Sequence, residues 1–141
     1  MGVTLNSKNY ECDFGYNGFN RLRTTIAELV GSDLGEHYKK LDEPMLMDDE
    51  ERAMFYHKYD LETQKLVKKY PKASAVFSFL YQPDCEGKLT CKDCKKLYEL
   101  IKDYDNDFLY GYCGRPDCAK FRDFKQIVKD CVETKTSMEW S

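Results

Sequence analysis

Apolar residues recur along much of this chain at the spacing of amphipathic helices. Between Asn17 and Gly31 they follow one helical face, and glycine is a common residue at the end of a helix. A second helix is predicted to begin at Asp48, whose carboxylate can cap it, and to stop before Pro71, with a break near Asp60. The first half of the chain is therefore expected to contain two helices.

Two further helices are predicted in the second half. Thr90 followed by Asp93 resembles a capping box, so a helix should run from there to about Lys102. Pro116 suits the first turn of a last helix. The side chains expected to point inward from this last helix are Phe121, Phe124, Ile127, Val128 and Cys131.

Strand patterns occupy the remaining segments. Residues 3–14 alternate around a polar turn and predict a hairpin or two short strands, and the apolar run 73–81 predicts a central strand. Shorter strands are expected at 108–112 and 137–140, while 32–47 is expected to be irregular. The predicted fold is α+β: a single compact helix-rich domain over residues 1–141 with a small, mostly antiparallel sheet.

Composition indicates a folded domain and argues against some classes of binding partner. Hydrophobic residues make up 42% of the 141 residues, which argues against disorder. A net charge of −3 argues against nucleic acid or an anionic membrane as partner, and no apolar run approaches a membrane span. Residues 1–5 carry no secretory pattern, so a cytoplasmic location is expected. One basic stripe is either a solvated face or a contact for phosphates: Lys65, Lys68, Lys69 and Lys72.

Five of the seven cysteines lie within one 34-residue window: Cys85, Cys91, Cys94, Cys113 and Cys118. Two short pairs at such a separation can close a tetrahedral thiolate site, and thiols near helix N-termini ionise more readily. The candidate structural zinc site comprises Cys91, Cys94, Cys113 and Cys118, with Cys85 as a substitute ligand. The alternatives are reduced, partly buried thiols or, for Cys118 beside a basic residue, a nucleophile.

A candidate binding site carries arginine and tyrosine. Arg21 and Arg23 lie in the first predicted helix, directly after an aromatic run that contains Tyr16. An arginine beside aromatic rings can bind an anion or a partner's carboxylate, or it can pair with an internal acid. Asp84 and Arg115 complete the candidate set of binding residues.

Two segments resemble a known group of proteins. Residues 15–23, GYNGFNRLR, and the turn at 84–89, DCEGKL, with Cys94 after it, are similar to small uncharacterised proteins of Gram-positive bacteria and their phages. The resemblance implies an α+β fold and supplies no catalytic residue. Cys91, Cys113 and Cys118 are not part of the shared pattern, so a zinc site would be peculiar to this chain.

The sequence favours a non-enzymatic cytoplasmic protein of phage or mobile-element type. It would bind a host protein, as an inhibitor does, or sequester a small ligand. Eleven tyrosines can furnish binding anchors at low entropic cost. A zinc-stabilised interaction domain and a cysteine-dependent enzyme are the alternatives, and the oligomeric state is left open.

Overall fold

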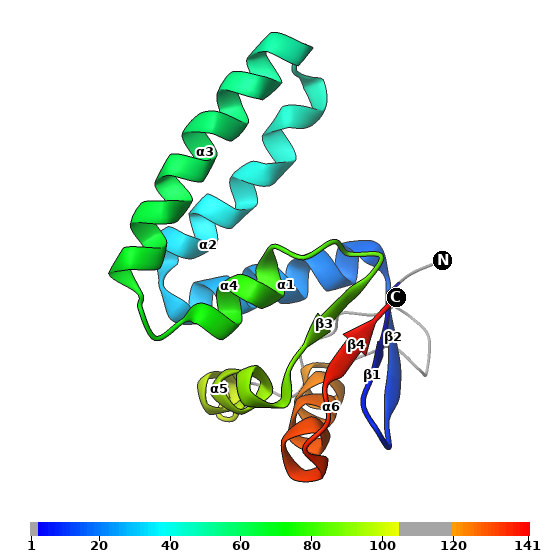
Figure 1. The fold of residues 1–141 in the computed structure, drawn as a ribbon. Coiled ribbons are helices and arrows are strands. Elements are labelled where there is room, and N and C mark those ends of the chain that lie inside the picture. Colours follow the sequence, from blue (N-terminus) through cyan, green and yellow to red (C-terminus); the bar gives the residue numbers. More distant parts are fainter. Residues whose placement is uncertain (1–2, 105–119) are drawn as a thin grey trace.

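A computed structural model describes residues 3–104 and 120–141 of the chain. Helices pack around one small sheet, and two of them project away from it (Figure 1). This is the α+β fold that the sequence predicts. In chain order the elements are β1 (Val3–Asn6), β2 (Glu11–Phe14), α1 (Tyr16–Val30), α2 (Ser32–Lys39), the 3-10 helix η1 (Lys40–Leu46), α3 (Asp49–Lys69), α4 (Ser74–Leu80), β3 (Gly87–Leu89), α5 (Cys91–Ile101), α6 (Phe121–Thr134) and β4 (Met138–Trp140).

The sheet is antiparallel throughout, with strand order β2-β1-β4-β3. The predicted N-terminal hairpin and the predicted closing strand are both present, and they pair with each other through Leu5 and Trp140. Leu89 of β3 pairs with Met138 of β4 on the other side. Side chains at these paired positions are buried, so one face of the sheet carries the core.

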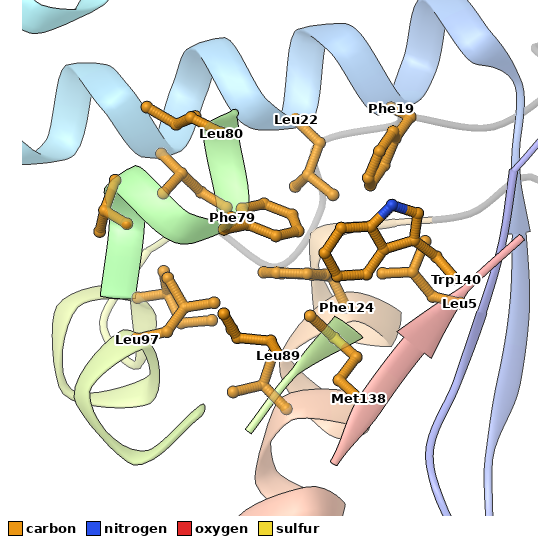
Figure 2. Packing of buried hydrophobic residues seen from close by; sticks show 14 of the residues in the cluster. Leu5, Phe19, Leu22, Phe79, Leu80, Leu89, Leu97, Phe124, Met138 and Trp140 are labelled. Atoms are coloured by element: carbon orange, nitrogen blue, oxygen red, sulfur yellow. The ribbon is translucent and has the colours of Figure 1, made fainter. Parts of the chain in front are cut away.

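Aromatic side chains fill the space between this face and the helices (Figure 2). The ring of Phe79 lies 5.5 Å from Trp140, 5.6 Å from Phe124 and 5.8 Å from Phe19, between ring centroids. The contacts with Phe19 and Trp140 are edge-on, which aromatic quadrupoles favour. Phe79 therefore joins α1, α4, α6 and β4 in one core.

The prediction of a central strand at 73–81 is wrong, because this segment forms α4. Its apolar run is short and buried on most sides, and periodicity cannot separate a buried strand from a buried helix turn over such a length. The fourth strand of the sheet is instead β3, an edge strand that the sequence did not predict. The side-chain amide of Gln82 satisfies the backbone of Lys88 at the outer edge of β3. It donates to the Lys88 carbonyl (2.7 Å) and accepts from the Lys88 amide (2.9 Å).

The prediction of an irregular segment at 32–47 is also wrong, because α2 and η1 occupy it. Gly31 ends α1 as predicted, but its backbone is extended and α2 starts at the next residue. Gly35 lets α2 pack closely on α1, since a Cβ there would lie 2.4 Å from Cγ of Glu28. Short helices with few apolar residues give a weak periodic signal.

The helix starts at Asp48 and Thr90 agree with prediction. The Asp48 carboxylate accepts from the Glu51 amide at 2.8 Å, and α3 continues to Lys69 without a break at Asp60. Thr90 Oγ1 accepts from the amide of the third residue after it, and α5 follows. The predicted strand at 108–112 and the helix start at Pro116 lie outside the described residues, whereas the five inward residues of α6 are all buried.

We call residues 32–69, which form α2, η1 and α3, the helical arm. Its helices run antiparallel and extend from the rest of the fold (Figure 1). All 21 residues of α3 are described, and only Tyr59 among them is buried. At the base of the arm Asp33 accepts hydrogen bonds from Lys69 Nζ (2.5 Å) and the Tyr70 hydroxyl (2.7 Å). These contacts fasten the end of α3 to the start of α2.

Candidate functional site

Arg23 lies in the core rather than on the surface. It occupies the inward face of α1 and is only 5% exposed. Its guanidinium carbon lies 4.4 Å from the ring centroid of Phe19, 5.5 Å from that of Phe79 and 5.7 Å from that of Trp140. Three aromatic rings therefore surround one cation, and the electron-rich faces of such rings attract it.

The hydrogen bonds of Arg23 are incomplete within the described part of the chain. Nε and one terminal nitrogen, Nη2, are buried and have no hydrogen-bond partner there. Tyr38 accepts a hydrogen bond from the guanidinium, and Asp84 contributes an attractive charge. Burial lowers the pKa of Arg23 from its ordinary value, although a guanidinium stays charged in proteins. The site thus holds a positive charge with two donors available to an acceptor.

The other predicted binding residues do not form one cluster with Arg23. Arg21 is exposed, because residues two apart on a helix lie on nearly opposite faces. Tyr16 begins α1 and is 41% exposed, and Asp84 is exposed in the turn before β3. Arg115 lies outside the described residues. Of this set the structure brings together Arg23 and the charge of Asp84.

The cysteines are dispersed between surface and core. Cys85 is exposed, Cys91 is half-buried and Cys94 is fully buried. The Cys94 thiol donates to the Leu89 carbonyl at 3.7 Å, and its interaction with Cys131 of α6 together with burial raises the pKa of the Cys94 thiol.

Zinc binding stays a prediction. Cys113 and Cys118 lie outside the described residues. The hypothesis that Cys118 is a nucleophile therefore also stays a prediction. Within residues 3–104 and 120–141, no group of three or more histidine, cysteine, aspartate or glutamate side chains is placed to hold a metal ion.

A polar cluster around the buried His37 and Tyr59, which the sequence did not reveal, joins the arm to the core. The His37 ring stacks on Tyr59 with centroids 3.9 Å apart, and Nε2 lies 2.7 Å from the Thr63 hydroxyl. Tyr59 in turn shares a hydrogen bond of 3.0 Å with the Tyr81 hydroxyl. Burial lowers the pKa of His37, which favours the neutral imidazole, while Glu62 at 3.5 Å opposes the shift. These contacts position α3 against α2 and the end of α4.

The far end of the arm exposes apolar side chains. We call residues 42–54 the arm tip. Met45 is 80% exposed, Leu46 is 100% exposed and Met54 is 75% exposed. Methionine is common at binding surfaces because its flexible thioether adapts to different partners. Sequence reasoning missed this surface because it expected residues 32–47 to be irregular.

The same tip is strongly acidic, with six acids and one arginine. Arg52 is partly engaged within the tip, since Nη2 donates to the Met47 carbonyl at 3.0 Å and Nη1 lies 3.6 Å from the Asp49 carboxylate. Part of the acidity has a local reason, since carboxylates stabilise the first turn of α3. The result is an apolar surface bordered by negative charge. The acids are Asp42, Glu43, Asp48, Asp49, Glu50 and Glu51.

In the described part of the chain, no helix combines the length and the apolar character that crossing a membrane requires. Comparisons with family models, with curated proteins and with solved structures found no match. The function of this chain must therefore be inferred from the geometry of its own surfaces and clusters.

Proposed function

We propose that this protein acts without catalysis, by binding a partner protein at the arm tip. The observation that carries the proposal is the exposure of Met45, Leu46 and Met54 at the end of a projecting arm. Burying one such side chain in an interface contributes about 1.5–3 kcal/mol. Three of them within ten residues of the sequence can form the apolar centre of an interface.

The charge of the tip specifies the partner. A surface that complements it has an apolar pocket bordered by lysine or arginine, because opposite charges steer association and disfavour wrong partners. A second copy of this chain is a poor occupant. In a two-fold dimer the same patch faces itself, so two acidic tips would repel each other. The resemblance of the sequence to phage proteins suggests a host protein as this partner.

The arm suits such a role in its construction. The arm is joined to the rest of the fold at its base, where Asp33 accepts from Tyr70 and Tyr59 shares a hydrogen bond with Tyr81, while the tip projects away (Figure 1). A rigid support lowers the entropy lost when the tip is bound. The protein would thus present a preformed contact surface away from its core.

The test is affinity purification from host cells with matched variants. The tip variant is Leu46→Ser with Met54→Ser, and the control is Val67→Ser, an exposed apolar residue near the base of α3 (45% exposed). All three chains should give the same circular dichroism. We expect one stoichiometric partner that the wild type and Val67→Ser retain and the tip variant loses.

The captured partner must then bind purified wild type directly, with affinity that falls as salt is raised, because the tip is acidic. Identical capture of this partner by the wild type, the tip variant and Val67→Ser would refute the proposal. So would a wild-type dimer, measured by light scattering, that the tip variant abolishes, because a second copy would then be the occupant.

A further inference from the structure

A groove lies at the base of the arm, at the opposite end from the tip. It has a volume of about 440 Å³. That volume falls in the range of sites for small organic ligands, about 300–1,000 Å³. It is formed where the end of α1, the α3–α4 connection and one face of α5 meet. Its lining residues are Leu29, Val30, Lys69, Tyr70, Pro71, Lys72, Ala73, Ala75, Val76, Lys96 and Leu100.

The floor of the groove is apolar. Leu29, Val30 and Leu100 are half-buried against the hydrophobic core, and Val76 is buried. Tyr70 is the one uncharged polar side chain among the lining residues, and its hydroxyl already donates to Asp33 at 2.7 Å. The floor can therefore accept a hydrocarbon chain but offers little to a polar ligand.

The rim of the groove is basic. Three lysines and no acidic residue belong to the described lining. Lys69 pairs with Asp33 at 2.5 Å, whereas Lys72 and Lys96 form no ion pair with any described residue. Two uncompensated ammonium groups thus stand beside an apolar opening, in a chain whose net charge is −3.

The wall formed by the α3–α4 connection, which includes Lys72, is held in place. Asp33 anchors both Lys69 and Tyr70, and Gly31 leaves the room that the Tyr70 ring occupies, since a Cβ there would lie 2.3 Å from the hydroxyl. Pro71 then restricts the backbone as the chain turns toward α4. The groove is preformed, which lowers the entropy cost of filling it.

We propose that this groove binds a small amphipathic carboxylate, with the alkyl chain on the apolar floor and the carboxylate between Lys72 and Lys96. Each half of the ligand meets the chemistry of its own part of the groove. The proposal is independent of the arm tip, because the two surfaces share no residue.

The probe is dodecanoate, used below its micelle concentration and measured by isothermal titration calorimetry and thermal unfolding. We expect saturable binding of one molecule and a rise in Tm with dodecanoate. Acetate, which has the same head group, and dodecylamine, which has the same chain with a cationic head, should not bind measurably. Equal binding of dodecanoate and dodecylamine would refute the anion site.

Variants locate the site. The double variant Lys72→Gln with Lys96→Gln should weaken dodecanoate binding about tenfold. Lys65→Gln with Lys95→Gln removes the same charge from exposed positions outside the groove lining and should bind as the wild type does. Ala73→Phe, which places a ring in the groove, should abolish binding. The arm-tip variant should bind dodecanoate normally.

Two results would overturn the proposal. The first is an absence of dodecanoate binding to the wild-type protein. The second is an affinity that both lysine double variants leave unchanged. Binding of an acidic amphipathic peptide in place of dodecanoate, lost in the Lys72/Lys96 variant, would assign the groove to a protein partner and reject the small-ligand proposal.

Discussion

The guanidinium carbon of Arg23 lies 4.4 Å from the centre of the Phe19 ring, four residues earlier on the same helix. This spacing stacks the two side chains on the inward face of α1. The contact explains why the core tolerates a cation, but it leaves Nε and Nη2 without acceptors in the described part of the chain.

Replacing this cation by an apolar residue of similar length should not destabilise the fold. Arg23→Met removes a buried charge whose desolvation is only partly offset, so we expect a free energy of unfolding equal to the wild type or higher by up to about 2 kcal/mol. Urea unfolding measures it. A loss of more than about 2 kcal/mol would contradict the view that the buried charge is only partly compensated.

The same variant tests the anion hypothesis for Arg23. If the guanidinium binds an anion, inorganic phosphate should raise the Tm of the wild type more than that of Arg23→Met. Arg21→Met, which removes an exposed charge from the same helix, is the control. Equal shifts for the three proteins would leave Arg23 with a structural role only.

Gly87 is required where β3 passes Trp140. A Cβ at this position would lie 2.1 Å from the indole ring, which belongs to the core. Gly87→Ala should therefore lower the free energy of unfolding by about 1–3 kcal/mol. Lys88→Ala, at the next and exposed position, should cost less than about 0.5 kcal/mol. Comparable losses for the two variants, measured in urea, would contradict the close packing.

Acidification should weaken the attachment of the arm through His37. Burial lowers the pKa of His37 in the folded state below the value of about 6.5 expected for the unfolded chain. The unfolded chain therefore binds the proton more readily, and His37 lowers stability as the pH falls below about 6.5. Thermal unfolding between pH 8 and pH 5 measures the effect.

Comparison with variants isolates His37 from the acids that also titrate. His37→Gln should show a smaller loss of Tm over this interval than the wild type does. His57→Gln, at an exposed histidine on the same arm, should follow the wild type. A wild-type profile in His37→Gln would exclude the imidazole as the source.

Asp33 should control the motion of the base of the arm. Hydrogen bonds from Lys69 and Tyr70 lower the pKa of Asp33 to about 2, so the carboxylate remains ionised well into the acid range. Asp33→Asn removes the negative charge that forms an ion pair with Lys69. We expect faster amide hydrogen exchange over the last turn of α3, without a change in β1 or β4. Asp60→Asn, at an exposed position on α3, is the matched control.

The sequence predicted best the elements that carry their own local signals. Asp48 and Thr90 mark helix starts through capping side chains, and the hairpin at 3–14 shows alternation around a polar turn. The inward residues of α6 follow one helical stripe. In each case a few neighbouring residues determine the structure.

The predictions from the sequence failed where contacts between distant segments determine the structure. The segment at 73–81 is a helix whose apolar residues are enclosed by α1, α5 and β3, and a short apolar run does not tell such a buried helix from a buried strand. The strand β3 has three residues and depends on pairing with β4. Among candidate binding residues, Arg23 was identified from the aromatic residues near it, but its enclosure by Trp140, more than a hundred residues later, could not be read from spacing.

The strand order places β4 between β1 and β3, so a strand that follows both of them in the sequence lies in the interior of the sheet. During synthesis this position stays empty until residues 138–140 have left the ribosome. The arm, by contrast, depends mainly on contacts between segments close in sequence and can form while translation continues. Nascent chains would therefore display the arm tip before the sheet is complete, and their unpaired β1 and β3 edges would be the surfaces most in need of chaperone protection.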